Sequence, residues 1–305
     1  MINIILLTGF LGSGKTTLLQ RLINHYEESP IAVIVNEFGE INIDARLLEK
    51  DGVKIAELSN GSVFCACIKE NFIQSIIEMT SREITYLFIE ASGLADPSNM
   101  DLILETIKSK VAHPCQYWGS ICVLDADSFI DLEGVLPAVK NQLLYAGSII
   151  INKEDLLTPS NKTTIQTIIQ SVNPNTPTYF TTYCNVDIDR LLKELRPTEK
   201  VAQKSSNTLE NQPPTLILKV LPSITLEKLN AFLDFVAPFT YRIKGFITVK
   251  EKNYSVSGVK SHLIIMPWPS EIKSANLVLI SAVGIGLVSA VADGITLYAK
   301  DLITL

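Results

Sequence analysis

The residues with the clearest chemical signature lie near the start of the chain. Residues 9–16 read Gly-Phe-Leu-Gly-Ser-Gly-Lys-Thr and match the GxxxxGK[ST] pattern of a phosphate-binding loop. In such a loop, backbone N–H groups turn toward an anion, and the helix that follows directs the positive end of its dipole to the same place. We therefore expect the phosphate contacts to come from Gly9, Gly12, Ser13, Gly14, Lys15 and Thr16.

The last two residues of this loop have separate predicted roles. The Lys15 ammonium should lie beside the terminal phosphates as a point charge, and the Thr16 hydroxyl should bind Mg²⁺. A glycine-rich turn that matches by chance is the alternative interpretation. The match lies between an apolar run and a helical pattern, which is the context that a phosphate-binding loop requires.

A carboxylate must also lie near the metal, and Glu90 is the first candidate. It follows the apolar run Ile84–Ile89, a predicted strand, so it should lie at the carboxyl edge of the sheet. Ligands of open α/β sheets bind at that edge. Asp125 follows a second apolar run, Ser120–Leu124, and is a weaker candidate, because it is equally consistent with a cap at the end of its strand.

A third strand end carries residues that read a base. Asn152-Lys153-Glu154-Asp155 follows the apolar run Ser148–Ile151 and has the pattern NKxD. The Asp155 carboxylate can accept two parallel N–H bonds from guanine, and adenine offers no such pair on that edge. A solvated charged loop is the alternative. Together with the phosphate loop, the pattern predicts GTP.

A phosphoryl-transferring enzyme of another class, a small-molecule kinase, is the competing interpretation. Kinases share the phosphate and Mg²⁺ motifs with GTPases. The Asn152–Asp155 segment argues against a kinase, because a kinase has no general need for a guanine reader.

The elements that position these residues indicate an α/β fold with a mostly parallel sheet. Apolar runs rich in β-branched residues alternate with helical patterns, as expected for strands buried on both faces. The predicted strands are Ile2–Leu7, Ile31–Val35, Ile84–Ile89, Ser120–Leu124 and Ser148–Ile151. The predicted helices are Thr16–Tyr26, Ile68–Thr80, Val135–Leu144 and Thr163–Val172.

A polar stretch separates this region from a second, smaller unit. We assign residues 1–196 to a phosphate-loop domain, 197–214 to a linker without hydrophobic periodicity, and 215–305 to a smaller α/β domain. Within the latter, we expect strands and one helix at Thr215–Val220, Leu226–Val236, Tyr241–Val249, Tyr254–Val259 and His262–Met266. A strand over Asn276–Ser281 and a helix after it complete the unit.

Composition excludes several classes of protein. Of the 305 residues, 47% are apolar, which is enough for a packed core, and the formal net charge of −6 argues against general nucleic-acid binding. Residues 274–292 carry no charge, but scattered polar residues and glycines argue against a membrane span. Five cysteines do not indicate a disulfide framework. We expect no signal peptide and a cytoplasmic location.

Taken in order, the motifs resemble the CobW-type family of P-loop GTPases, relatives of the hydrogenase and urease nickel-insertion GTPases. The resemblance covers about residues 2–195. Its motifs are Gly9–Thr17, Val35–Glu40 with Asp44, Glu57–Gly61, Glu90–Pro97 and Asn152–Asp155.

The resemblance implies a slow GTPase that couples its nucleotide state to delivery of a metal or a metal cofactor. Thr17 would join the phosphate contacts, Asp44 would lie in a switch segment at Mg²⁺, and Glu37 would lie nearby. Glu90 would serve the metal or the attacking water, and Thr181–Asn185 would cover the guanine. Ordering of switches by the γ-phosphate and Mg²⁺ is a recurrent way to signal nucleotide state.

The metal motif departs from the family pattern. The family typically carries Cys-x-Cys-Cys after an Asn-Gly pair, and here the matching positions hold Ser62, Val63, Phe64 and Cys65, with Cys67 two residues further. Thiolates select Zn²⁺ and other soft or borderline ions. Cys65 and Cys67, with Glu37, are thus candidate ligands for zinc or cobalt, and a packing role for the two thiols is the alternative.

Two functions remain open at this point. The first is GTP-dependent delivery of a metal or metal cofactor, such as zinc, cobalt or a corrinoid, to a client metalloprotein. The second is a GTP-switched module that activates a corrinoid or methyltransferase protein and binds no metal itself. The family resemblance also suggests a homodimer around the nucleotide.

Overall fold

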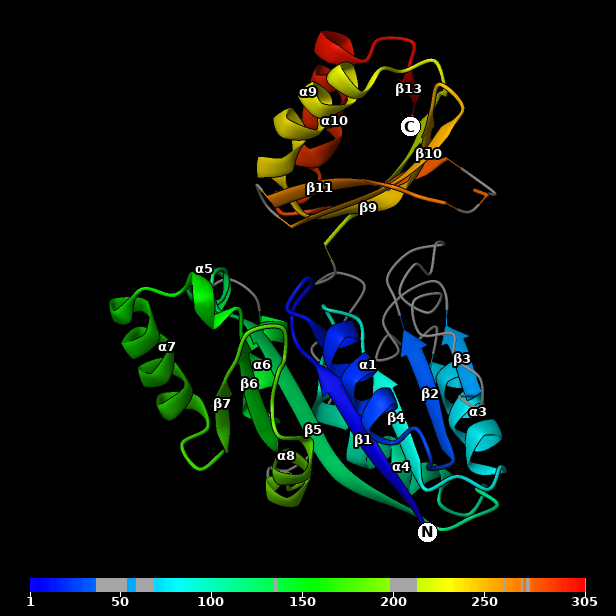
Figure 1. Cartoon of the computed structure of the whole chain (residues 1–305), viewed down its shortest axis with the longest axis vertical. Helices are drawn as coiled ribbons and strands as arrows, with labels where there is room; N and C mark the ends of the chain where they lie inside the picture. The colour runs from blue at the N-terminus through cyan, green and yellow to red at the C-terminus, as the bar shows by residue number, and fades with distance from the viewer. Residues whose placement is uncertain are drawn as a thin grey trace. The chain divides into compact units, whose positions relative to one another are not determined.

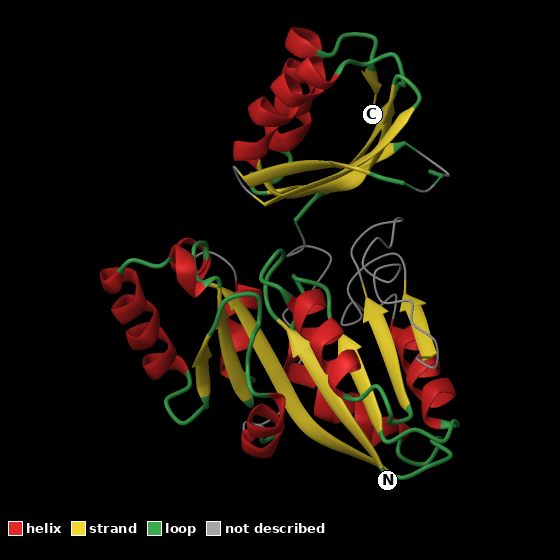
Figure 2. Cartoon of the chain, viewed as in Figure 1, coloured by secondary structure: helices red, strands yellow, loops and turns green. Residues whose placement is uncertain are grey.

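The computed structural model of the chain describes residues 1–36, 54–58, 69–133, 137–197, 213–259, 262–269, 271–272 and 275–304. The chain forms two compact units, Met1–Asn211 and Gln212–Leu305. The first is a parallel sheet with helices on both faces, and the second is a smaller unit of strands and helices (Figures 1 and 2). The predicted α/β fold is confirmed.

The first unit is built on a seven-stranded sheet in the order β3-β2-β4-β1-β5-β6-β7, and every pairing is parallel. Its strands are β1 Ile2–Thr8, β2 Ile31–Asn36, β3 Lys54–Leu58, β4 Tyr86–Glu90, β5 Cys115–Asp125, β6 Ser148–Asn152 and β7 Thr178–Phe180. Its helices are α1 Lys15–His25, α3 Lys69–Thr80, α4 Met100–Ile107, α5 Phe129–Glu133, α6 Pro137–Leu144, α7 Pro159–Val172 and α8 Ile188–Glu194. Short 3₁₀ turns lie at Pro97–Asn99 and Glu154–Leu156.

Alternate residues of β1 enter two different cores, one on each face of the sheet. Ile4 and Leu6 pack with residues of α3 and α4, whereas Ile5 and Leu7 pack with residues of α1 and α8. Both sets are buried, so the central strands read as continuous apolar runs rather than as an alternating pattern. Figure 1 shows these helices on opposite sides of the sheet.

The strand order brings the predicted site residues to one place. β4, β1, β5 and β6 are neighbours and run in the same direction, so their carboxyl ends lie side by side at one edge of the sheet. The phosphate loop follows β1, and Glu90, Asp125 and Asn152 are the last residues of β4, β5 and β6.

Several elements differ from the predicted boundaries. β5 begins at Cys115, five residues before the predicted start, because its first half is only partly buried and its register against β1 shifts between Ile4 and Ile5. The predicted helix Val135–Leu144 is α6, which begins at Pro137. The helix predicted from Thr163 begins at Pro159, where Thr158 Oγ1 accepts a hydrogen bond from the Asn161 N–H. The short elements β3, α4, β7 and α8 were not predicted.

The second unit carries a six-stranded antiparallel sheet in the order β11-β10-β9-β12-β8-β13. Its strands are β8 Thr215–Val220, β9 Thr240–Val249, β10 Lys252–Val259, β11 His262–Pro267, β12 Asn276–Ser281 and β13 Ile303–Thr304, and its helices are α9 Leu226–Val236 and α10 Gly286–Tyr298. The two helices contribute to one core with the sheet, and α10 approaches α9 closely at Gly294, where an added Cβ would lie 3.0 Å from the Phe235 ring.

The uncharged stretch 274–292 divides between β12 and α10 as predicted. Among the residues that the structure describes, no helix has both the length and the apolar character needed to cross a bilayer.

Candidate functional site

The loop between β1 and α1 has a backbone that only glycine allows at two positions. Gly9 has φ +131° and Gly14 has φ +110°, both in the left-handed region. A Cβ on Gly9 would lie 2.0 Å from the Val123 carbonyl oxygen, and a Cβ on Gly14 would lie 2.4 Å from Asn152 Nδ2. The loop therefore packs closely against β5 at Gly9 and against Asn152, the last residue of β6, at Gly14.

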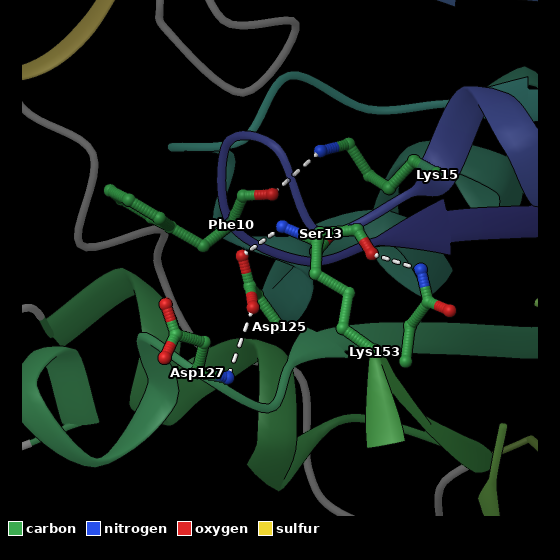
Figure 3. A network of polar contacts seen from close by, with 7 residues as sticks. Phe10, Ser13, Lys15, Asp125, Asp127 and Lys153 are labelled. Carbon is green, nitrogen blue, oxygen red and sulfur yellow. Dashed lines mark hydrogen bonds and ion pairs between the residues drawn. The ribbon is translucent and has the colours of Figure 1, made fainter. Parts of the chain in front are cut away.

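The first turn of α1 is built to face an anion. Gly14 is its N-cap, and within this fully described turn no side chain caps the helix and no residue is acidic. The buried Lys15 ammonium donates to the carbonyls of Gly9, at 2.8 Å, and Phe10, at 3.1 Å (Figure 3). Uncapped N–H groups and a cation folded over the loop suit a bound phosphate.

A hydroxyl and a carboxylate meet beside this turn. Thr16 Oγ1 donates to Glu90 Oε1 at 2.8 Å, so the start of α1 is joined to the end of β4. Glu90 is only 5% exposed. Hydroxyl and carboxylate oxygens are the hard donors that Mg²⁺ prefers, and the metal is usually held by one or two such side chains together with phosphates. The pair therefore fits a magnesium ion that bridges to a bound nucleotide. Thr17, the next residue, is exposed.

The end of β6 is bonded directly to the phosphate loop. The buried side-chain amide of Asn152 donates from Nδ2 to the Ser13 carbonyl at 2.8 Å. Its Oδ1 accepts the backbone N–H of Cys184, also at 2.8 Å. One amide therefore fixes the phosphate loop, the NKxD segment and the segment 181–185 relative to one another.

Lys153 is held by a carboxylate from the neighbouring strand. Its backbone is left-handed, with φ 62°, and its ammonium lies 2.6 Å from Asp125 Oδ2 (Figure 3). The other oxygen of Asp125 accepts the backbone N–H of Asp127. Asp125, the weaker sequence candidate for the metal, is thus engaged in a buried cap and an ion pair at the base-reading segment.

Asp155 lies in the short turn that follows Lys153. Its Oδ1 accepts a hydrogen bond from the Thr182 hydroxyl at 3.0 Å, and the Glu154 N–H donates to the Thr181 carbonyl. The segment 181–185 predicted from the resemblance therefore runs directly beside the carboxylate predicted to read guanine. Because the Asp155 side chain is exposed, it is accessible to a base.

Cys184 belongs to the Thr181–Asn185 segment that the resemblance places over the guanine, and its side chain packs against the phosphate loop. Its side chain is fully buried, and its Sγ donates to the Gly14 carbonyl at 3.4 Å. Burial raises the pKa of this thiol to about 12, against a smaller opposing effect of Arg21. The thiol is therefore neutral at physiological pH and acts as a small packing group between two loops. No local sequence pattern marks it, because its contacts are formed by residues far apart in the chain.

The loop after β4 rests on the phosphate loop and is tied to α6. A Cβ on Gly93 would lie 2.5 Å from the Leu11 nitrogen. The buried Gln142 amide donates to the carbonyls of Gly93, at 3.2 Å, and Ala95, at 2.9 Å. Asp96 accepts a bond from Asn141 Nδ2 in the same helix. Gln142 was not singled out in the sequence, because a lone glutamine in a helix carries no motif.

Four predicted residues, Asp44, Glu37, Cys65 and Cys67, lie outside the described residues. Their roles stay predictions. Among the residues that the structure describes, no three His, Cys, Asp or Glu side chains gather into a metal-binding group.

Comparison with known proteins identifies the nucleotide-binding part of the chain. Residues 3–180 match the family described as "CobW/HypB/UreG, nucleotide-binding domain". These residues include the phosphate loop, Glu90 and the Asn152–Asp155 segment.

The individual proteins that the chain resembles share about 30% of its residues over the aligned region. The chain is 31% identical over 198 residues to "Zinc chaperone YjiA" of Escherichia coli, covering 62% of this chain and 60% of that protein. It is 28% identical over 286 residues to "Zinc-regulated GTPase metalloprotein activator 1" of Saccharomyces cerevisiae, covering 81% of this chain and 66% of that one. Each match thus spans less than two thirds of the relative. Among solved structures, Zn(II)-bound YjiA GTPase from E. coli has a TM-score of 0.48 at 21% identity, covering 96% and 98% of the two chains.

The burial of Cys184 predicts unusual resistance to alkylation. Iodoacetamide reacts with the thiolate, and with the pKa raised to about 12 by burial, native Cys184 should stay neutral from pH 7 to pH 10. Mass spectrometry of the peptide that contains Cys184 should show little labelling over this range. The same peptide in denaturant, where the thiol has its ordinary pKa, serves as the control. Native labelling at pH 8 as fast as in denaturant would contradict the described packing.

Proposed function

The chain belongs to the CobW/HypB/UreG family, and from this premise we propose that it binds GTP with Mg²⁺, hydrolyses it slowly, and couples nucleotide state to delivery of zinc to a client protein. The observation that carries the proposal is the Asn152 amide, which joins the phosphate loop to the base-reading segment through Ser13 and Cys184. One ligand with a triphosphate at one end and a base at the other fits this arrangement.

The phosphate end is assigned to the first turn of α1. The left-handed glycines Gly9 and Gly14 would let backbone N–H groups turn toward the phosphates, and Lys15 would add the cation that neutralises the terminal phosphates. Thr16 and Glu90 would hold Mg²⁺, which would supply positive charge to neutralise the phosphates. Glu90 would also orient the attacking water. Asp44 and Glu37 are proposed to complete this side of the site.

The base end is assigned to Asp155. Its exposed carboxylate is placed by the turn at residues 154–156 and by the Thr182 hydroxyl. The ion pair between Lys153 and Asp125 fixes the start of that turn. A carboxylate held in this way accepts the two N–H groups on one edge of guanine.

Zinc as the cargo is supported by the names of the relatives, which include zinc chaperones and zinc-regulated GTPase activators. The chemistry of the candidate ligands agrees with it, because thiolates and a carboxylate form zinc sites. Cys65, Cys67 and Glu37 are proposed as ligands from this chain, with the remaining positions supplied by water or by the client.

Asp155→Asn should weaken GTP binding by about 10- to 100-fold, because the charge-assisted hydrogen bonds to the base are worth roughly 1.5–3 kcal/mol. Titration calorimetry with GTP, ATP and xanthosine triphosphate in the presence of Mg²⁺ measures the change. Asp234→Asn, the same substitution at an exposed position of α9, should leave affinity unchanged. A preference for ATP that persists in Asp155→Asn would favour a kinase instead.

Glu90→Gln should separate binding from chemistry. Glutamine can still accept the Thr16 hydroxyl, so the affinity for GTP should change by less than about 3-fold. Turnover should fall by about 100-fold, a typical loss when a positioned acid–base group is removed. Phosphate release and calorimetry measure the two quantities. Glu105→Gln, exposed on α4, is the matched control, and equal losses of affinity and turnover would assign Glu90 to ligand binding alone.

The zinc half of the proposal is tested with Cys65→Ser/Cys67→Ser. The double variant should lose stoichiometric Zn²⁺ binding while GTP turnover stays within about 2-fold of the unmodified chain, because thiolate ligands dominate zinc affinity. Metal analysis of protein equilibrated with Zn²⁺, with GTP, GDP and neither, gives the readout. Cys115→Ser, at a half-buried thiol, is the matched control. Absence of zinc from the unmodified chain in every nucleotide state would leave a GTP-switched partner-binding module.

A further inference from the structure

β11, residues His262–Pro267, forms one edge of the second unit's sheet. β11 is the terminal strand in the order β11-β10-β9-β12-β8-β13, and within the described part of the chain only β10 pairs with it (Figure 1). An edge strand presents a row of backbone N–H and C=O groups that can pair with another strand.

The hydrogen-bond ladder tells which backbone groups face outward. The Trp268 N–H donates to the Asn253 carbonyl at 2.8 Å, so even-numbered residues of this segment are bonded to β10. Because the direction of the backbone groups alternates along an antiparallel strand, Leu263 and Ile265 direct both N–H and C=O away from β10. Pro267 directs only a carbonyl outward, and its missing N–H lies on the open side, where proline is tolerated.

The side chains of the strand are apolar on both faces. Leu263 and Ile265 pack against the core that the sheet shares with α9 and α10. On the opposite face, Ile264 is 55% exposed and Met266 is 57% exposed. The segment 262–268 contains no Lys, Arg, Asp or Glu. Edge strands are usually protected by such charges, so this edge lacks the most common barrier to strand pairing.

We propose that β11 pairs antiparallel with β11 of a second copy of this chain, around a two-fold axis that lies midway between Ile265 and Ile265 of the partner subunit. A two-fold axis perpendicular to the sheet keeps each side chain on its own face of the sheet. An odd-numbered residue of β11 must therefore lie opposite an odd-numbered residue of the partner subunit, and an even-numbered residue opposite an even-numbered one. In this register Ile265 exchanges two hydrogen bonds with Ile265 of the partner subunit. Each Leu263 N–H donates to the carbonyl of Pro267 of the partner subunit.

The same register accounts for the exposed side chains. Ile264 lies opposite Met266 of the partner subunit, and Met266 lies opposite the partner's Ile264. Both are non-hydrogen-bonded pairs, in which the side chains approach most closely. All four exposed apolar side chains of the two strands are thus covered at once. An axis midway between Ile264 and Ile264 of the partner subunit would instead place Met266 opposite the partner's His262, and so pair fewer apolar residues with one another.

Sedimentation of the full chain without nucleotide tests the pairing independently of the proposed function. Over about 1–300 μM, the weight-average mass should rise toward that of a dimer. Ile264→Lys and Met266→Glu should each reduce the dimer fraction at least 5-fold, because two copies then bring unpaired charges to the edge. Leu297→Lys, at a residue 63% exposed on α10, is the control and should dimerise like the unmodified chain.

Mixing the two charged variants tests the register. An equimolar mixture of Ile264→Lys and Met266→Glu should recover the dimer, because the introduced lysine of one copy then lies opposite the introduced glutamate of the other. Hydrogen exchange should show protection of the Leu263 and Ile265 amides at high concentration only. A chain that stays monomeric to 300 μM, or that dimerises unchanged in both charged variants, overturns the proposal. A dimer that the mixture does not restore overturns the register.

Discussion

The arrangement of the candidate site depends on one buried amide. Asn152 ends β6, donates to the Ser13 carbonyl and accepts the Cys184 N–H, each at 2.8 Å. A buried polar group without a hydrogen-bond partner destabilises the folded state, so the structure must keep both of these hydrogen bonds. The residue types around it are constrained too, because a side chain at Gly14 would collide with this amide. This contact sets the distance between the phosphate loop and the turn that carries Asp155.

The parallel sheet supplies the second constraint. β4 pairs with β1 so that Glu90 lies opposite Leu7, and the chain enters the phosphate loop two residues later. This register brings Glu90 within hydrogen-bond reach of Thr16 across 74 residues of sequence. The second unit differs from the first: its sheet is antiparallel, its two described helices pack on one face, and its edge strand β11 contains no Lys, Arg, Asp or Glu.

The candidate site residues that sequence reasoning could single out are those with a local signal, and the structure brings them to one edge of the sheet. The phosphate loop, Glu90 and the NKxD segment each follow an apolar run, and strand ends are readable from such runs. The contacts of Cys184, the role of Gln142 and the pairing of Lys153 with Asp125 could not be predicted, because they depend on contacts between distant segments. The start of β5 escaped prediction for another reason: its first half is partly exposed, and its register shifts against β1. The short elements β7 and α8 are too brief for a periodic pattern.

Gln142 ties the loop after β4 to α6, so the loop cannot shift alone without breaking hydrogen bonds. Its buried amide donates to the Gly93 and Ala95 carbonyls, and the partly buried Asn141 amide donates to Asp96 beside them. A small drift of this loop would stretch these hydrogen bonds. We therefore expect any displacement of this loop that keeps these hydrogen bonds to carry the attached end of α6 with it.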